Sequence, residues 1–211
     1  MPMNWIERLY EIKGKDLYSQ NGEGLILEYI FEHLPNDLDR IFVDIGGGDF
    51  FYLSNTRHLR QLGYTPFKGK VLDKSNGHFI TVENIRNYIT NYHIMNLLSI
   101  DIDGNDYWIL EEILKYCQPE IICAEFNPSF TDSRTIKYNP NHIWDGTDYY
   151  GFSFEAGKKL AEANGYKVIF QIADMNMIMV RSDLVTVPFP EVTFKQNDFF
   201  PKSNREDWVM I

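Results

Sequence analysis

Short apolar runs alternate with amphipathic segments along most of this 211-residue chain, and this alternation is the feature that most limits the fold. Runs rich in β-branched residues predict buried strands, and the segments between them place apolar residues at helical spacing. We expect strands over residues 40–45, 69–73, 78–82, 97–102, 119–125, 166–172 and 176–181. Helices are expected over residues 23–34, 55–62, 83–91, 106–116 and 152–164. Such alternation is typical of a parallel sheet with helices on both faces.

The end of the chain adds a constraint on the sheet. The last two expected strands are separated only by residues 173–175, ADM. A connection this short cannot carry the helical crossover that parallel strands need, so the two strands must pair antiparallel. The expected fold is therefore α/β, similar to Rossmann-like doubly wound sheets, with seven strands of which the last is antiparallel. We expect one domain over residues 1–211, with a core at about 17–182 and a tail, 183–211, that packs on it.

The charge balance limits the partners of the protein. The chain carries 20 Lys and Arg against 30 Asp and Glu, a net charge of −10. This disfavours binding along a nucleic-acid backbone, which needs clustered cations. No apolar stretch reaches the about 18 residues of a membrane-spanning helix, and the two cysteines form no disulfide framework. We expect a cytoplasmic protein, and its oligomeric state, including a homo-oligomer, stays open.

The first expected strand ends in a glycine-rich turn, residues 42–49, FVDIGGGD. Glycine is needed where a chain turns tightly or where its backbone approaches a ligand closely. This favours a nucleotide-like ligand, although a purely structural turn has the same composition. The turn resembles the loop with which SAM-dependent methyltransferases hold S-adenosylmethionine (SAM). That resemblance implies that Asp44, Gly46 and Gly48 lie at the methionine end of SAM.

Acidic residues follow the next two expected strands. Asp73 ends the second strand, where in doubly wound folds a carboxylate accepts hydrogen bonds from the two hydroxyls of a ribose. Aspartate is also an ordinary turn residue at this position. Glu83 follows the third expected strand, where related folds often contact the edge of adenine; it could equally be an acid at the start of a helix.

The densest group of candidate site residues follows the fourth and fifth strands. Asp101 and Asp103 share one face of a strand, and Glu125 and Asn127 end the next one. Carboxylates that converge in a cleft need a cation, a proton or hydrogen bonds, and oxygen ligands suit Mg²⁺. Alternatively, Asp103 and Asp106 cap the following helix and Asn127 begins a turn. We assign Asp103, Glu125 and Asn127 as metal-ligand candidates.

Several of these segments resemble the FkbM-type methyltransferases. The matching motifs are 19–23 (SQNGE), 43–46 (VDIG), 54–56 (SNT), 99–106 (SIDIDGND) and 144–151 (WDGTDYYG). The resemblance covers about residues 17–182 and implies a class I methyltransferase fold, with Asp73 at the ribose and Asp101 near the methyl group. It adds Asn55, Thr56 and Gln20 as cofactor-binding candidates, although Gln20 and Glu23 could instead be a capping pair. Residues 125–127 also resemble the metal-binding pair of Mg²⁺-dependent O-methyltransferases, here split by Phe126.

A long turn-rich segment, residues 127–150, precedes the last helix. Its His142 is a candidate general base because histidine titrates near neutral pH, although a loop histidine is more often simply exposed. The segment also holds several aromatic and acidic residues, which suit a sugar or an amine: Trp144, Asp145, Asp148, Tyr149 and Tyr150.

Together these residues predict a SAM-dependent methyltransferase, a transferase that methylates a hydroxyl (or an amine) of a small polar acceptor such as a sugar or glycan precursor. An O-methyltransferase is favoured, with Mg²⁺ as a further cofactor candidate. Asp101, Asp103, Glu125 and His142 are the catalytic candidates, which position or deprotonate the acceptor. The alternatives are a non-catalytic SAM- or nucleotide-binding module and an NAD-dependent oxidoreductase. The sequence shows no tyrosine–lysine or histidine–aspartate pair that would favour the oxidoreductase.

Overall fold

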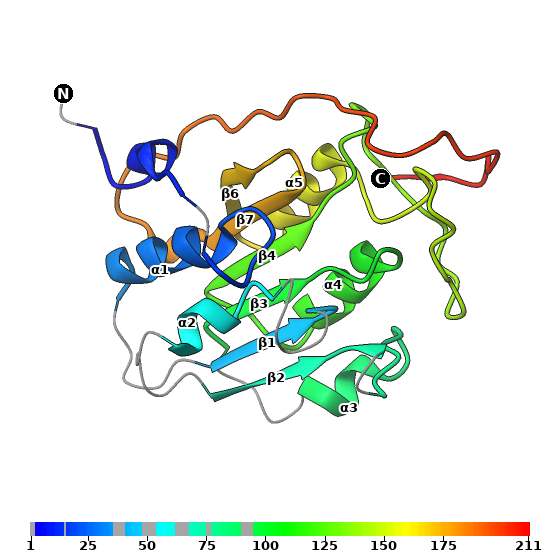
Figure 1. Ribbon diagram of the computed structural model, residues 1–211, viewed down its shortest axis with the longest axis horizontal. Helices are drawn as coiled ribbons and strands as arrows, with labels where there is room; N and C mark the ends of the chain where they lie inside the picture. The colour runs from blue at the N-terminus through cyan, green and yellow to red at the C-terminus, as the bar shows by residue number, and fades with distance from the viewer. Residues whose placement is uncertain are drawn as a thin grey trace.

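The computed structural model describes residues 3–14, 16–35, 41–47, 54–61, 68–74, 77–89 and 95–211 (Figure 1). Within them a six-stranded mixed sheet has the order β2-β1-β3-β4-β7-β6. The strands are β1 (Ile41–Ile45), β2 (Lys68–Leu72), β3 (Leu97–Ile100), β4 (Ile121–Glu125), β6 (Tyr166–Ile172) and β7 (Asn176–Arg181). The α-helices are α1 (Glu23–His33), α2 (Arg57–Gln61), α3 (Ile85–Ile89), α4 (Asp106–Leu114) and α5 (Phe154–Ala163).

The strand directions confirm the expected reversal at the end of the sheet. Strands β2, β1, β3 and β4 are parallel, whereas β7 lies antiparallel between β4 and β6. The β6–β7 turn places Ala173 and Asp174 at φ +54°, and the Met175 amide donates to the Ile172 carbonyl at 3.0 Å. Two successive residues with positive φ form the tight turn that matches the twist of a hairpin.

The expected strand at residues 78–82 was wrong, so six rather than seven strands build the sheet in the described residues. Local hydrogen bonds use the backbone groups that a strand would need. The His78 amide donates to the Asp73 carbonyl at 2.9 Å, and the Asn84 side chain binds the Thr81 amide and the Phe79 carbonyl. The segment therefore turns across the end of β2 and leads into α3.

Helices cover both faces of the sheet, and successive strand residues pack against opposite faces, as the doubly wound pattern predicts. Phe42 of β1 packs with α1 and α2, whereas its neighbour Val43 packs with α3, α4 and α5 on the opposite face. Figure 1 shows α1 and α2 together on one side of the sheet. Among the described residues, no helix is both long and apolar enough to cross a lipid bilayer.

In Figure 1 the tail runs along the upper edge of the molecule, and its red end lies on the side to which β1, β2 and β4 point. Its residue Val192 is buried in the same core as α4 and α5. At its end, β8 (Val209–Met210) pairs antiparallel with β5 (Arg134–Thr135), a short strand in the long segment before α5. The tail thus covers the region where that segment meets the sheet.

Candidate functional site

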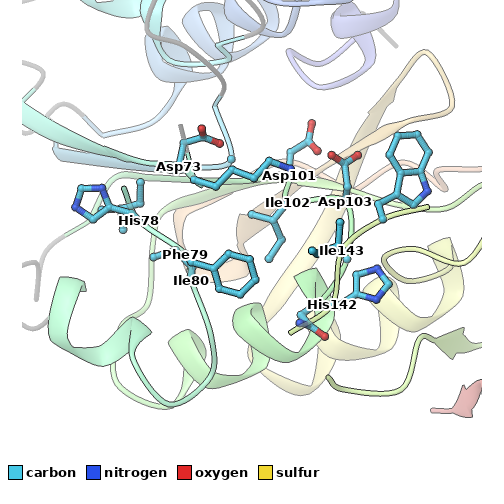
Figure 2. A pocket seen from close by; sticks show the side chains of 15 residues that line it. Asp73, His78, Phe79, Ile80, Asp101, Ile102, Asp103, His142 and Ile143 are labelled. Carbon is cyan, nitrogen blue, oxygen red and sulfur yellow. The ribbon is translucent and has the colours of Figure 1, made fainter. Parts of the chain in front are cut away.

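A cavity of about 200 Å³ lies where the parallel strands end, the usual ligand position in an open α/β sheet (Figure 2). Residues from three strand ends and from the segment before α5 line it. They are Gly46, Leu72, Asp73, Lys74, His78, Phe79, Ile80, Asp101, Ile102, Asp103, Gly104, Asn105, His142, Ile143 and Trp144. The predicted candidates Gly46, Asp73, Asp101, Asp103 and His142 are thus brought to one cavity.

Gly46 ends β1 at φ +88° and donates its amide to the Leu72 carbonyl at 2.9 Å. A Cβ added there would lie 1.5 Å from the carbonyl oxygen of Asp101 and 2.4 Å from its carbonyl carbon. The protein's own backbone therefore excludes any side chain at this position, in addition to the unfavourable φ. Gly48, the other glycine assigned to the cofactor, lies outside the described residues.

Asp44 lies beneath the glycine turn, fully buried. Its carboxylate accepts hydrogen bonds from Thr56 Oγ1 at 2.8 Å and from Ser54 Oγ at 3.2 Å, and Asn55 donates to Ser99 Oγ nearby. Burial raises the pKa of Asp44, and the hydroxyl hydrogen bonds offset part of that rise. Asp44, Asn55 and Thr56 therefore come together, but as a polar layer that supports the turn and not as cavity lining.

The other cofactor candidates divide between cavity and surface. Asp73 lines the cavity, as the ribose hypothesis requires. Glu83 lies outside it: the side chain is exposed and accepts a hydrogen bond from the Tyr138 hydroxyl at 2.6 Å, so the expected adenine contact is not supported. Gln20 is exposed. Glu23 is fully buried and binds Asn21 and Asn176 side chains, so it does not cap α1 with Gln20.

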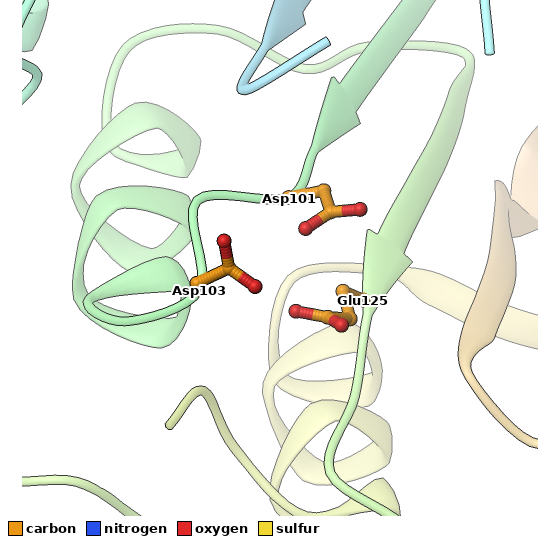
Figure 3. A group of neighbouring side chains, drawn as sticks. All are labelled: Asp101, Asp103 and Glu125. Carbon is orange, nitrogen blue, oxygen red and sulfur yellow. The ribbon is translucent and has the colours of Figure 1, made fainter. Parts of the chain in front are cut away.

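Three carboxyl groups converge at the ends of β3 and β4 (Figure 3). One oxygen each of Asp101, Asp103 and Glu125 lies within 4.8 Å of the others; we call these three residues the acid cluster. Asp103 adopts φ +54°, a conformation that costs energy in most residues but is less unfavourable for aspartate. This turn aims its side chain back toward Glu125 instead of along the strand, as Figure 3 shows.

Asp106 fixes the turn that carries Asp103. Its two carboxylate oxygens accept from the amides of Ile102 and Gly104, each at 2.8 Å. The N-cap of α4 is Asn105, which makes no side-chain capping bond. The alternative in which Asp103 and Asp106 cap this helix was therefore wrong, and Asp106 instead organises the preceding loop.

Burial and mutual repulsion raise the pKa values of the acid cluster. Burial, then the charges of Asp106 and Asp103, raise the pKa of Asp101 to about 8. Burial and then the charge of Asp101 raise the pKa of Glu125 well above its ordinary value. Burial also raises the pKa of Asp103, against the opposing charge of Lys74. Glu125 is only 6% exposed, and its Oε2 has no hydrogen-bond partner among the described residues.

Asn127, the third metal-ligand candidate, is engaged elsewhere. Its Nδ2 donates to the carbonyls of Asp148 and Tyr150 at 2.8 and 3.0 Å, and its Oδ1 accepts from the Ser129 amide at 3.0 Å. The side chain is fully buried, so these bonds satisfy backbone groups that water cannot reach. The structure thus corrects the metal assignment of Asn127 in favour of the turn alternative.

His142 packs against the turn of Asp103 and Gly104. A Cβ on Gly104 would lie 2.6 Å from His142 Cδ2, so this glycine makes room for the ring. Burial, then the positive charge of Arg205, lower the pKa of His142, which keeps it neutral near pH 7. Its Nε2 is buried and has no hydrogen-bond partner in the described part of the chain. A neutral imidazole with a free ring nitrogen is able to accept a proton.

The aromatic segment 144–150 is expected to form a binding surface, but only Trp144 of these residues lines the cavity. Trp144 lines the cavity and packs edge-on against Phe200 of the tail. Tyr149 and Tyr150 are buried, as is Asp148, which accepts from the Ser203 amide at 2.7 Å. These residues hold the segment and the tail together instead of facing a ligand.

The sequence did not indicate the apolar lining of the cavity. Phe79 and Ile80 were assigned to a strand, and Ile102 to the buried end of another. All three line the cavity because the chain turns at these positions. The polar Asn84, which holds the turn at residues 79–81, was the available signal against a strand.

No protein-family model matches the sequence, and a search of curated proteins gives no match. The structure is similar to the CurJ carbon methyltransferase, with a TM-score of 0.42 and 11% identity over 75% of this chain and 52% of that chain. TnmH has a TM-score of 0.35 and 11% identity over 67% of this chain and 50% of its own. The small RNA methyltransferase HEN1 has a TM-score of 0.36 and 11% identity over 91% of this chain and 26% of its own. This chain therefore spans about half of CurJ and TnmH and less of HEN1. Similarity this weak assigns no family, and the FkbM resemblance stays a prediction.

Proposed function

We propose that this protein is a SAM-dependent methyltransferase that acts on a hydroxyl or an amine of a small polar acceptor. One observation carries the proposal: Gly46, Asp73 and Asp101 line one cavity at three strand ends, and the acid cluster lies beside it. An anionic, partly apolar cavity suits SAM, which has a positively charged sulfonium and a planar base. SAM supplies an electrophilic methyl group.

The chain's own residues have three tasks in this proposal. Asp73 accepts hydrogen bonds from the ribose hydroxyls, and Ile80 and Ile102 give the base an apolar wall. Because Gly46 has no side chain, its backbone is accessible to a ligand in the cavity. The acid cluster orients the acceptor and takes its proton, with His142 as a second proton acceptor. Asp44, Asn55 and Thr56 act indirectly, because they support the turn.

The acid cluster also suits a magnesium ion. Mg²⁺ prefers carboxylate oxygen ligands and retains several waters, so three carboxylates without Asn127 are sufficient. The unpartnered Oε2 of Glu125 is compatible with such a ligand. An ion here would be held by Asp101, Asp103 and Glu125 and would polarise the acceptor oxygen.

Calorimetric titration of the intact protein with SAM, S-adenosylhomocysteine and NAD tests the proposal. We expect the two sulfur compounds to bind and NAD to bind far more weakly. Binding of NAD alone would assign the oxidoreductase, and no binding of any of the three would reject the methyltransferase. A non-catalytic module would bind SAM but release no S-adenosylhomocysteine over a broad set of amine and alcohol acceptors.

A further inference from the structure

Among the described residues, no Lys or Arg side chain forms a salt bridge with the acid cluster. Asp106, the fourth acid in this region, is satisfied by two backbone amides, but the carboxyl groups of Asp101, Asp103 and Glu125 face one another. In the ligand-free protein a retained proton relieves their repulsion, since burial and the neighbouring charges raise the pKa of Asp101 to about 8. The Glu125 side chain is aimed into the cluster in Figure 3, and its Oε2 is buried and unpartnered. A positively charged hydrogen-bond donor can take the place of the retained proton and donate to this oxygen.

The bases among the described lining residues do not supply that group. Lys74 is exposed at the end of β2, where its charge acts on Asp103. His142 packs against the turn at Gly104, and its buried Nε2 makes no hydrogen bond to the acid cluster among the described residues. The net charge of −10 further favours the approach of a cation from solution.

Two of the three exposed side chains that line the cavity are apolar, and the third is Lys74. Phe79 is 46% exposed and Ile143 is 79% exposed, and both line the cavity (Figure 2). Trp144 lines it as well. Apolar side chains gathered at a cavity mouth are typical of a surface that a ligand covers. A fully hydrated metal ion would leave these side chains in water, whereas an organic ligand with an apolar body would bury them.

We infer that the methyl acceptor is an amine with an apolar or aromatic body, which enters as an ammonium ion. Its nitrogen lies among Asp101, Asp103 and Glu125, and its body lies against Phe79, Ile143 and Trp144. This inference rests on the proposed methyl transfer and specifies the acceptor of that reaction.

The chemistry balances with the groups present. The ammonium first gives one proton to a carboxylate of the acid cluster, which leaves a nitrogen lone pair. That pair attacks the methyl carbon, a carbon–nitrogen bond forms, and the carbon–sulfur bond breaks with its electrons staying on sulfur. The products are S-adenosylhomocysteine and the methylated ammonium, and the proton on the carboxylate passes to solvent.

Calorimetry on the intact chain, saturated with S-adenosylhomocysteine in buffer containing EDTA, tests the inference with phenethylamine and phenethyl alcohol. The two probes have the same apolar body and differ in charge. We expect the amine to bind at least about tenfold more tightly, the scale of one charged hydrogen bond. Asp101→Asn and Glu125→Gln should each weaken amine binding by about tenfold and leave the alcohol unchanged. Glu11→Gln removes the same charge from an exposed side chain outside the cavity and should have no effect.

Equal affinity for the two probes, or no detectable binding of the amine, overturns the inference. Amine binding that appears only after Mg²⁺ replaces EDTA also overturns it and assigns the acid cluster to a metal. The affinity for S-adenosylhomocysteine is measured on the same samples. If that ligand binds and the amine does not, only the acceptor class is wrong; if it does not bind, the methyltransferase proposal and this inference both fail.

Discussion

The carbonyl oxygen of Asp101 occupies the place that a side chain on Gly46 would need. An added Cβ would lie 1.5 Å from this oxygen, far inside van der Waals contact. The two residues directly follow the neighbouring parallel strands β1 and β3, so the glycine lets the strand ends approach. The sequence suggested a ligand as the reason for this glycine, but the packing of the chain is a sufficient reason by itself.

Gly46→Ala should therefore destabilise the fold itself. The matched control is Gly165→Ala, since Gly165 has φ +83° and nothing within 4 Å of an added Cβ. The control should cost about 1–2 kcal/mol for the left-handed conformation alone. Gly46→Ala should cost at least about 2 kcal/mol more, through overpacking. Urea denaturation monitored by circular dichroism measures both, and equal losses would refute the steric argument.

Asp73→Ala should weaken SAM binding by about 1–3 kcal/mol, the scale of a lost hydrogen bond to a charged group. Glu83→Ala is the control, because Glu83 is exposed and lies outside the cavity. We expect its affinity for SAM to match the parent protein. Calorimetry measures the dissociation constant of SAM for both variants. Unchanged affinity in the folded Asp73 variant would remove that residue from the site.

The acid cluster should make stability depend on pH. The pKa of Asp101 is about 8 in the folded protein, against an ordinary value of 3.8. Between these values the folded state holds a proton that the unfolded state has released, so the unfolding free energy falls as pH rises toward 8. Asp101→Asn removes this contribution, and its stability relative to the parent should rise between about pH 5 and pH 8. Urea titrations in EDTA across this range would show a constant difference if Asp101 ionised normally.

Asp103→Asn should separate chemistry from stability. Loss of a proton acceptor should lower turnover by about a hundredfold, whereas loss of a like charge beside Asp101 should raise the unfolding free energy of the ligand-free protein. Release of S-adenosylhomocysteine with phenethylamine as acceptor measures turnover. If the acceptor is an amine held directly by the acid cluster, EDTA should not change the turnover of the parent protein. Inhibition by EDTA that Mg²⁺ reverses would instead establish a metal-dependent reaction.

Asn127→Ala should act on stability and not on cation binding. The variant leaves the carbonyls of Asp148 and Tyr150 without their donor, at a cost of about 1–3 kcal/mol for a buried unsatisfied group. Asn141→Ala, on the exposed part of the same segment, should be nearly neutral. Denaturant midpoints compare the two. A loss of Mg²⁺ binding in a stable Asn127 variant would return this residue to the metal hypothesis.

Much of the local structure could be predicted from the sequence because it depends on short-range patterns. Apolar runs predicted β1, β3, β4, β6 and β7 within a few residues, since each buried strand must be apolar. The three residues between β6 and β7 fixed their antiparallel pairing, because no crossover fits in that length. The convergence of the acids at the strand ends could be predicted because parallel pairing brings the ends of β3 and β4 to one edge of the sheet.

Only the tertiary structure decided what each polar residue does. Asp44 and Asp101 both end strands in acidic motifs, yet one is buried under hydroxyl donors and the other lines the cavity. Asn127 looked like a ligand because a sequence cannot show that distant carbonyls use its amide. The left-handed turn at Asp103 likewise depends on Asp106 binding two amides. Residue type determines which hydrogen bonds and charges are available, whereas partners brought together by packing determine which of them remain free for a ligand.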